Sequence, residues 1–123
     1  MNWSEELPDN CPPSNAEAPD NNKVYYRMAR SNPLSESDFY SQAKVGTKRA
    51  IQGGGDPCVM RGVSVYDDVK ALANRLGLPQ AGKYIVEFTL NTEDGVVLEG
   101  RDHHWTWWKT DKFSISRCTI VEL

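Results

Sequence analysis

The chain has 123 residues, of which 39% are hydrophobic and 25% are charged, values typical of one soluble globular domain. Its formal charge of −3 excludes a general basic coat for nucleic acid, so a nucleic-acid partner is not expected. No apolar run reaches the roughly 20 residues of a membrane span. The first residues also lack the basic and apolar regions of a secretory signal. We therefore expect a cytoplasmic protein without membrane contact.

Three cysteines, Cys11, Cys58 and Cys118, are spread along the chain without a CxxC spacing. An odd number of widely spaced cysteines argues against a disulfide framework and against a structural zinc ribbon. The cysteine pattern thus predicts a protein of a reducing compartment.

Residues 1–22 hold four of the seven prolines and five acidic residues but no basic one, so their net charge is −5, against +2 for the rest. Proline and like charges oppose helix and sheet, which predicts an extended arm. The arm either stays disordered or covers a basic groove of its own domain, with Trp3 and Leu7 as apolar anchors. Its deletion is expected to cost less than about 1–2 kcal/mol of stability.

The first half of the body alternates strand and helix signals. Residues 24–29 are rich in strand formers, and Ser35 with the acids after it starts a short helix that ends near Gln42. Residues 43–58 predict a loop that is first basic (Lys44, Lys48, Arg49) and then glycine-rich. A second strand is expected over 59–66.

The second half carries the clearest helix. Asp67 predicts an N-cap, residues 68–76 place apolar side chains on one face, and Gly77 ends the helix. Strands are expected over 83–90, 96–99, 103–108 and 117–123, with a hairpin turn at 91–95 that pairs 96–99 back onto 83–90. The pattern predicts a compact α+β domain over 23–123, with a mostly antiparallel mixed sheet and two helices.

Both histidines and three of the four tryptophans lie within residues 103–108. On a strand, His103 shares a face with Trp105 and Trp107, while His104 shares the other with Trp108. We predict that one histidine lines a pocket with Trp105 or Trp108 in its wall, where its ordinary pKa near 6.5 suits proton transfer. Because neighbouring strand residues point opposite ways, no metal site is expected. The alternative is that the tryptophans are core residues.

Three residues of the earlier strands complete the candidate site. Arg27 offers a fork that suits a phosphate, and Ser64 shares a strand face with Tyr66. If Arg27 grips a ligand, Arg27→Ala should abolish binding and leave the melting temperature nearly unchanged. The alternative is that each residue is satisfied locally by backbone.

This order of features, Tyr25-Tyr26-Arg27, then Gly62-Val63-Ser64-Val65-Tyr66 before a helix, then His103-His104, resembles small bacterial ADP-ribosyltransferase-like toxins. The resemblance implies a split sheet with an NAD cleft. It assigns Arg27 to the NAD phosphate or ribose and Ser64 to the nicotinamide pocket. We expect Tyr66, Trp105 and Trp108 to line the same cofactor site. The family's Glu-x-Glu or Gln-x-Glu motif is missing here, so His103 or His104 would take the catalytic role, or the protein would bind without catalysing.

Two classes of function follow. The first is a toxin-like effector of a bacterial conflict system that uses NAD, as a glycosyltransferase or an NAD hydrolase, and is held by a cognate antitoxin. The second is a non-enzymatic antitoxin, immunity protein or adaptor that binds a protein partner through its acidic arm. An unrecognised hydrolase or deaminase, a Cys58–histidine site and a single-strand nucleic-acid binder remain further alternatives.

Overall fold

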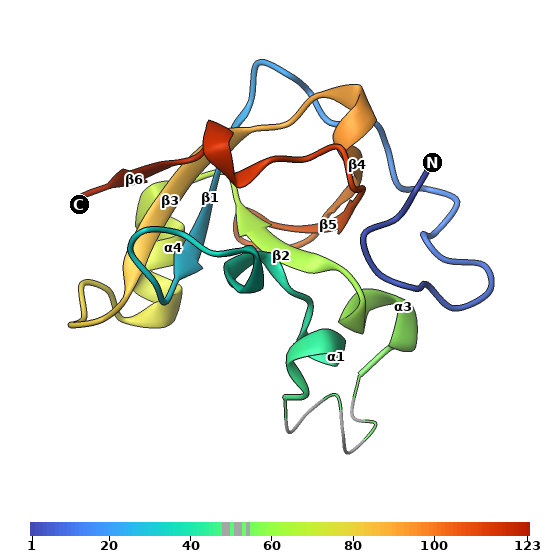
Figure 1. Cartoon of the computed structure of the whole chain (residues 1–123), viewed down its shortest axis with the longest axis horizontal. Helices are drawn as coiled ribbons and strands as arrows, with labels where there is room; N and C mark the ends of the chain where they lie inside the picture. The colour runs from blue at the N-terminus through green and yellow to red at the C-terminus, as the bar shows by residue number, and fades with distance from the viewer. Residues whose placement is uncertain (48–49, 51–52, 54) are drawn as a thin grey trace.

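The computed structural model describes residues 1–47, 50, 53 and 55–123, so the predicted basic residues Lys48 and Arg49 lie outside the described part. Six strands form one open sheet in the order β4-β5-β2-β1-β3-β6 (Figure 1). Their bounds are β1 Val24–Ala29, β2 Val63–Tyr66, β3 Tyr84–Thr89, β4 Gly95–Glu99, β5 His104–Lys109 and β6 Thr119–Val121. The α+β class is confirmed. The paired strands are all antiparallel, so the sheet is not mixed.

The described residues form three α-helices rather than two: α1 Gln42–Val45, α3 Pro57–Met60 and α4 Val69–Leu76. Helix α4 was predicted from its sequence, although its N-cap is Asp68 and not Asp67. Helix α3 replaces the start of a predicted strand, because Asp56 accepts hydrogen bonds from the backbone of Cys58 and Val59 and so caps a helical turn. Short 3-10 turns occur at η1 Glu36–Phe39, η2 Thr92–Asp94 and η3 Ile115–Arg117.

Each face of the sheet carries its own core. One face holds the main cluster, in which Tyr25, Phe39, Phe88 and Trp107 are almost fully buried. The other face packs against α4, where Leu72 lies with Tyr66 and Ile85 (Figure 1). Side chains of β2 therefore alternate between two distinct environments, and this alternation decides where Ser64 and its neighbours point.

The predicted pairing of 83–90 with 96–99 is wrong. Strand β4 pairs only with β5 among the described strands, and the sheet order separates it from β3 by three strands. Instead of forming a tight hairpin, the chain turns through η2. There the buried Asp94 carboxylate forms an ion pair with Arg117, with 2.7 Å between Oδ2 and Nη2.

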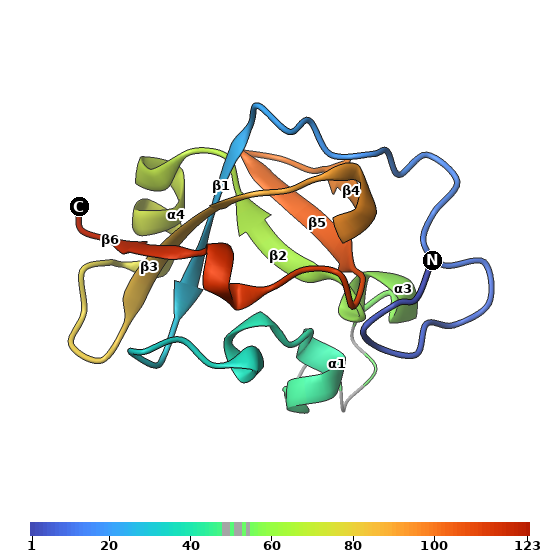
Figure 2. The same ribbon diagram turned by 45° about the horizontal axis from the view of Figure 1, so that its top comes forward.

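The arm is neither disordered nor held mainly by charge. Cys11 and Cys58 form a disulfide across a sequence separation of 47, which contradicts the expectation that the cysteines are reduced. Glu17 exchanges two 2.8 Å backbone hydrogen bonds with Val97 at the edge of β4. Figure 2 shows the arm, coloured dark blue, beside α3 and the β4–β5 end of the sheet. The arm thus lies along its own domain.

The buried carboxylate of Glu5 is the arm's main polar anchor. It accepts hydrogen bonds from the backbone and the hydroxyl of Ser41 and pairs with Arg61 at 3.2 Å. Trp3 and Ser4 run antiparallel to the end of β5, with the Ser4 amide donating to the Lys109 carbonyl at 2.9 Å. The prediction that deletion of the arm costs less than 1–2 kcal/mol conflicts with these contacts.

Candidate functional site

Ser64 and His104 meet on the face of the sheet that α4 borders. His104 Nε2 lies 3.0 Å from Ser64 Oγ, within hydrogen-bond distance. The pair is partly buried, and the Tyr66 ring stands edge-on to the imidazole at 5.2 Å between centroids. A hydroxyl, an imidazole and a phenol therefore converge on one small surface.

The register of β2 and β5 explains the convergence. Tyr66 stands directly opposite His104, and Ser64 stands opposite Thr106. Because alternate residues of a strand share a face, Ser64, Tyr66 and His104 all point to the α4 side. The late strand that carries His104 thus lies next to the strand that carries Ser64, although 40 residues separate them in the sequence.

Burial lowers the pKa of His104 below its ordinary value, and the positive charge of Arg75 lowers it further. The imidazole is therefore neutral at pH 7, with one ring nitrogen able to accept a proton. Among the described residues no carboxylate forms a hydrogen bond with His104. The Ser64–His104 pair is consequently a dyad rather than a complete triad.

Acidification should destabilise the protein through His104. The unfolded chain takes up a proton near pH 6.5, whereas folded His104 resists protonation until a lower pH. Stability contributed by neutral His104 is thus fully present above about pH 6.5 and is lost below it. We expect His104→Gln to flatten the fall in the free energy of unfolding between about pH 6.5 and 5, measured by urea titration. A histidine resonance of His104 that titrates at or above pH 6.5 would contradict this.

His103 belongs to a separate polar cluster. It lies in a turn before β5 with a left-handed φ of 68°, and its Nδ1 donates to Asp67 Oδ1 at 2.8 Å. Trp105 Nε1 donates to the other oxygen of Asp67 at 2.9 Å, and Lys23 lies 3.5 Å from it. Burial acts to raise the Asp67 pKa, but these hydrogen bonds and charges outweigh it and lower the pKa. Of the two histidines, only His104 shares a face with Ser64.

The structure contradicts the predicted role of Arg27. Its side chain points to the opposite face from Ser64, and its three nitrogens donate to the backbone carbonyls of Asp38 (2.7 Å), Ser64 (2.6 Å) and Tyr40 (3.3 Å). Burial lowers the pKa of Arg27 to about 10, although the Asp38 charge opposes this shift, so the group stays charged at pH 7. A guanidinium with every nitrogen occupied is not available to grip a phosphate.

Neither of the two tryptophans that were predicted to bind a cofactor stands beside the dyad. Trp108 is completely buried and donates to the Cys58 carbonyl at 2.9 Å, so the prediction that it binds a cofactor is wrong. Trp105 packs partly exposed against the main core, edge-on to Tyr25, and on the other face of the sheet from Ser64. Of the predicted aromatic residues, only Tyr66 stands beside the dyad.

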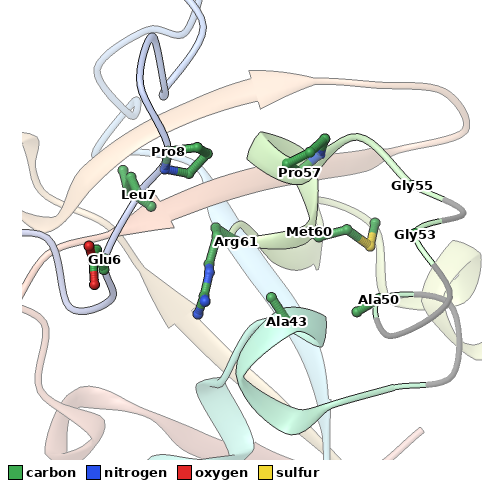
Figure 3. Close-up of a pocket in the computed structure, with 10 residues that line it drawn as sticks. All are labelled: Glu6, Leu7, Pro8, Ala43, Ala50, Gly53, Gly55, Pro57, Met60 and Arg61. Atoms are coloured by element: carbon green, nitrogen blue, oxygen red, sulfur yellow. The ribbon is translucent and has the colours of Figure 1, made fainter.

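Two cavities in the described part of the chain lie away from the dyad. One of about 390 Å³ is enclosed by the arm, α1 and α3 (Figure 3), with Leu7, Pro8, Met60 and Arg61 among its lining residues. Another of about 260 Å³ lies between Tyr40, Lys44 and Lys109. Neither is lined by Ser64, Tyr66 or His104.

Asp67 and Arg75 are the site-proximal residues that sequence reasoning missed. Asp67 was interpreted as a helix cap, but Asp68 performs that role and frees Asp67 to bind His103. Two consecutive aspartates before a helix could have indicated that one of them has another partner. Arg75 carried no local signal, because an arginine in the last turn of a helix is ordinary.

Comparisons with protein families, curated proteins and solved structures find no match to the chain. Within the described residues, no three histidine, cysteine or acidic side chains gather as a metal site. None of the described helices combines the length and hydropathy that crossing a bilayer requires.

Proposed function

We propose that the protein is a toxin-like bacterial effector that binds NAD on the surface of Ser64, Tyr66 and His104 and cleaves or transfers at its nicotinamide bond. The observation that carries this proposal is the 3.0 Å contact between His104 and Ser64 in a partly buried setting. The sheet offers further support. β1 and β2 share a single aligned pair, whereas β1 and β3 share six, which agrees with the split sheet that the family resemblance implies.

The neutral imidazole defines the chemistry available. His104 can accept the proton of a hydroxyl or water that attacks the ribose carbon, as a general base does. Ser64 holds the ring in position through its hydroxyl. Nicotinamide is a good leaving group, so positioning and stabilisation of positive charge supply most of what the reaction needs. Tyr66 provides an aromatic wall beside the reacting ring.

The site departs from the family pattern in two respects. Arg27 is turned away from Ser64, so a different cation must hold the phosphates. His104 takes the place of the catalytic glutamate in this proposal, because Glu99 lies exposed opposite Trp105, on the other face of the sheet from Ser64.

NAD consumption tests the proposal directly. We expect the purified chain to release nicotinamide from NAD, measured by chromatography, and its expression in bacteria to slow growth. Ser64→Ala and His104→Gln should each lower the rate at least about 100-fold, the lower end of general base catalysis. Ser37→Ala, in the exposed η1 turn, is the matched control and should leave the rate unchanged. No nicotinamide release by the unaltered chain would refute the proposed reaction.

The alternative function, a non-enzymatic antitoxin, immunity protein or adaptor, is favoured by one observation. The dyad lies outside both cavities, and binding surfaces for protein partners are shallow whereas those for small ligands are concave. The arm does not favour it, because the arm is already packed on its own domain. A growth defect that disappears in Ser64→Ala would exclude this alternative.

The compartment is part of the same proposal. The sequence predicts a cytoplasmic protein, whereas disulfides such as Cys11–Cys58 persist mainly in oxidising environments. We infer that the protein works after leaving the reducing cytoplasm, as an effector that acts outside its producing cell would do.

A further inference from the structure

Helix α4 places a cation beside the Ser64–His104 dyad. Leu72 of α4 packs against Tyr66, the residue directly opposite His104. Arg75 lies three residues after Leu72 and four after Ala71, which packs in the same cluster. Residues three and four apart share one face of a helix. Arg75 therefore lies on the same side of α4 as Leu72, the residue that packs in one cluster with Tyr66.

The charge of Arg75 is not neutralised by a partner. The residue is exposed, and no ion pair joins it to a carboxylate of the described chain. The positive charge of Arg75 acts on the pKa values of both His104 and Tyr66. After burial, Arg75 is the only charge that shifts the pKa of His104, and it is the larger of two charges that act on the Tyr66 pKa.

We propose that Arg75 forms an anion site beside the Ser64–His104 dyad and takes a phosphate group of the ligand. The inference rests on the proposed function for the identity of the whole ligand, but the anion site itself is independent of any reaction. A guanidinium fork suits two oxygens of a phosphate.

The position of Arg27 makes a second cation necessary. Arg27 is occupied by three carbonyls on the opposite face and cannot reach a ligand beside Ser64. Arg75 stands on the correct face and has free donors. Acidic residues oppose this charge. The charge of Asp102 raises the Tyr66 pKa, with a smaller influence than Arg75. The charges of Glu87 and Asp68 raise the pKa of Tyr26, which packs in the same cluster.

Inorganic pyrophosphate is the probe, because it presents the diphosphate group of a dinucleotide without its bases. Calorimetric titration of the full chain should show binding that Arg75→Gln weakens about tenfold or more, the loss expected for a charge-assisted pair. Arg75→Lys should recover part of it. The matched control is Arg30→Gln, an exposed arginine of another surface, which should bind as the unaltered chain does. Equal binding by Arg75→Gln, or no binding by the unaltered chain, overturns the proposal.

Nuclear magnetic resonance of His104 gives a second readout. Removal of the Arg75 charge should raise the His104 pKa, and bound pyrophosphate should raise it in the unaltered chain. A His104 pKa that pyrophosphate leaves unmoved would place the anion elsewhere and refute the site. The outcomes distinguish the anion site from the enzymatic reaction. If Arg75→Gln loses pyrophosphate binding but the unaltered chain does not cleave NAD, the anion site is supported and the reaction is refuted. If the Arg75→Gln variant still cleaves NAD and binds pyrophosphate normally, the reaction is supported and the anion site is refuted.

Discussion

Replacement of Arg27 by methionine should lower the free energy of unfolding by roughly 3 kcal/mol, because it strips three buried carbonyls of a charged donor. The guanidinium ties Asp38 and Tyr40 to Ser64, and it reaches the Ser64 carbonyl where β1 and β2 share only one aligned pair. Arg27 thus links β1 to β2 through a side-chain hydrogen bond at a place where the two strands share only one aligned pair of residues. For a chain of this length the melting temperature should fall by roughly 10 °C or more.

Arg30→Met is the control for this experiment. It changes the same residue type three positions along the chain, but its side chain is exposed, and only its backbone amide contacts Asp38. We expect a change within about 0.5 kcal/mol. Thermal and urea unfolding of both variants decide the matter. An Arg27→Met variant with an unchanged melting temperature would show that Arg27 is not structural and would restore its predicted ligand role.

The predicted role of Arg27 was wrong because the sequence of one strand does not say which of its two faces is buried. Residues 24–29 read Val-Tyr-Tyr-Arg-Met-Ala, with an aromatic residue on each face, so alternation alone cannot decide which face is buried. The register with β2 and β3 decides it: Tyr25 and Ala29 enter the main core, and Arg27 follows them. An arginine on the buried face then needs carbonyl partners from distant segments, which no local pattern contains.

Features with local causes were predicted well. Helix α4 has its capping aspartate, its apolar stripe and its terminal glycine all within eleven residues, and it forms nearly as expected. The alternation of β5 correctly separated His104 from Trp105 and Trp107. Pairing partners were not predictable in this way. The partner of β4 is β5 rather than β3, and the turn between β3 and β4 holds the buried Asp94, whose ion-pair partner Arg117 is distant in the sequence.

The cysteines illustrate the same limit. An odd count with no regular spacing correctly excludes a framework of several bridges, but it says nothing of a single bridge. The Cys11–Cys58 bond depends on the arm returning to α3, a path set by Glu5, Trp3 and the edge of β4. Proline content and charge predicted that the arm is extended; they could not predict where an extended segment docks.

Removal of the disulfide should have an effect as large as the loss of Arg27. A bridge across a sequence separation of 47 restricts the unfolded chain by about 4 kcal/mol in the chain-entropy account, within a usual range of roughly 2–5 kcal/mol. We expect the double variant Cys11→Ser, Cys58→Ser to lose about that amount in urea unfolding, and reductant to lower the stability of the unaltered chain equally. The arm then also docks less tightly, so the Ser41 amide, which donates to the Glu5 carboxylate, should lose protection from hydrogen exchange.

The third cysteine provides the control. Cys118 is partly buried, and burial raises the pKa of its thiol to about 11, which makes it unreactive in the folded state. Cys118→Ala should cost about 1 kcal/mol or less and leave the effect of reductant intact. Denatured protein should take up one alkylating group without reductant and three with it, because only Cys118 is free. Three groups without reductant would show that the bridge is absent, and a double variant as stable as the unaltered chain would show that it does not hold the arm.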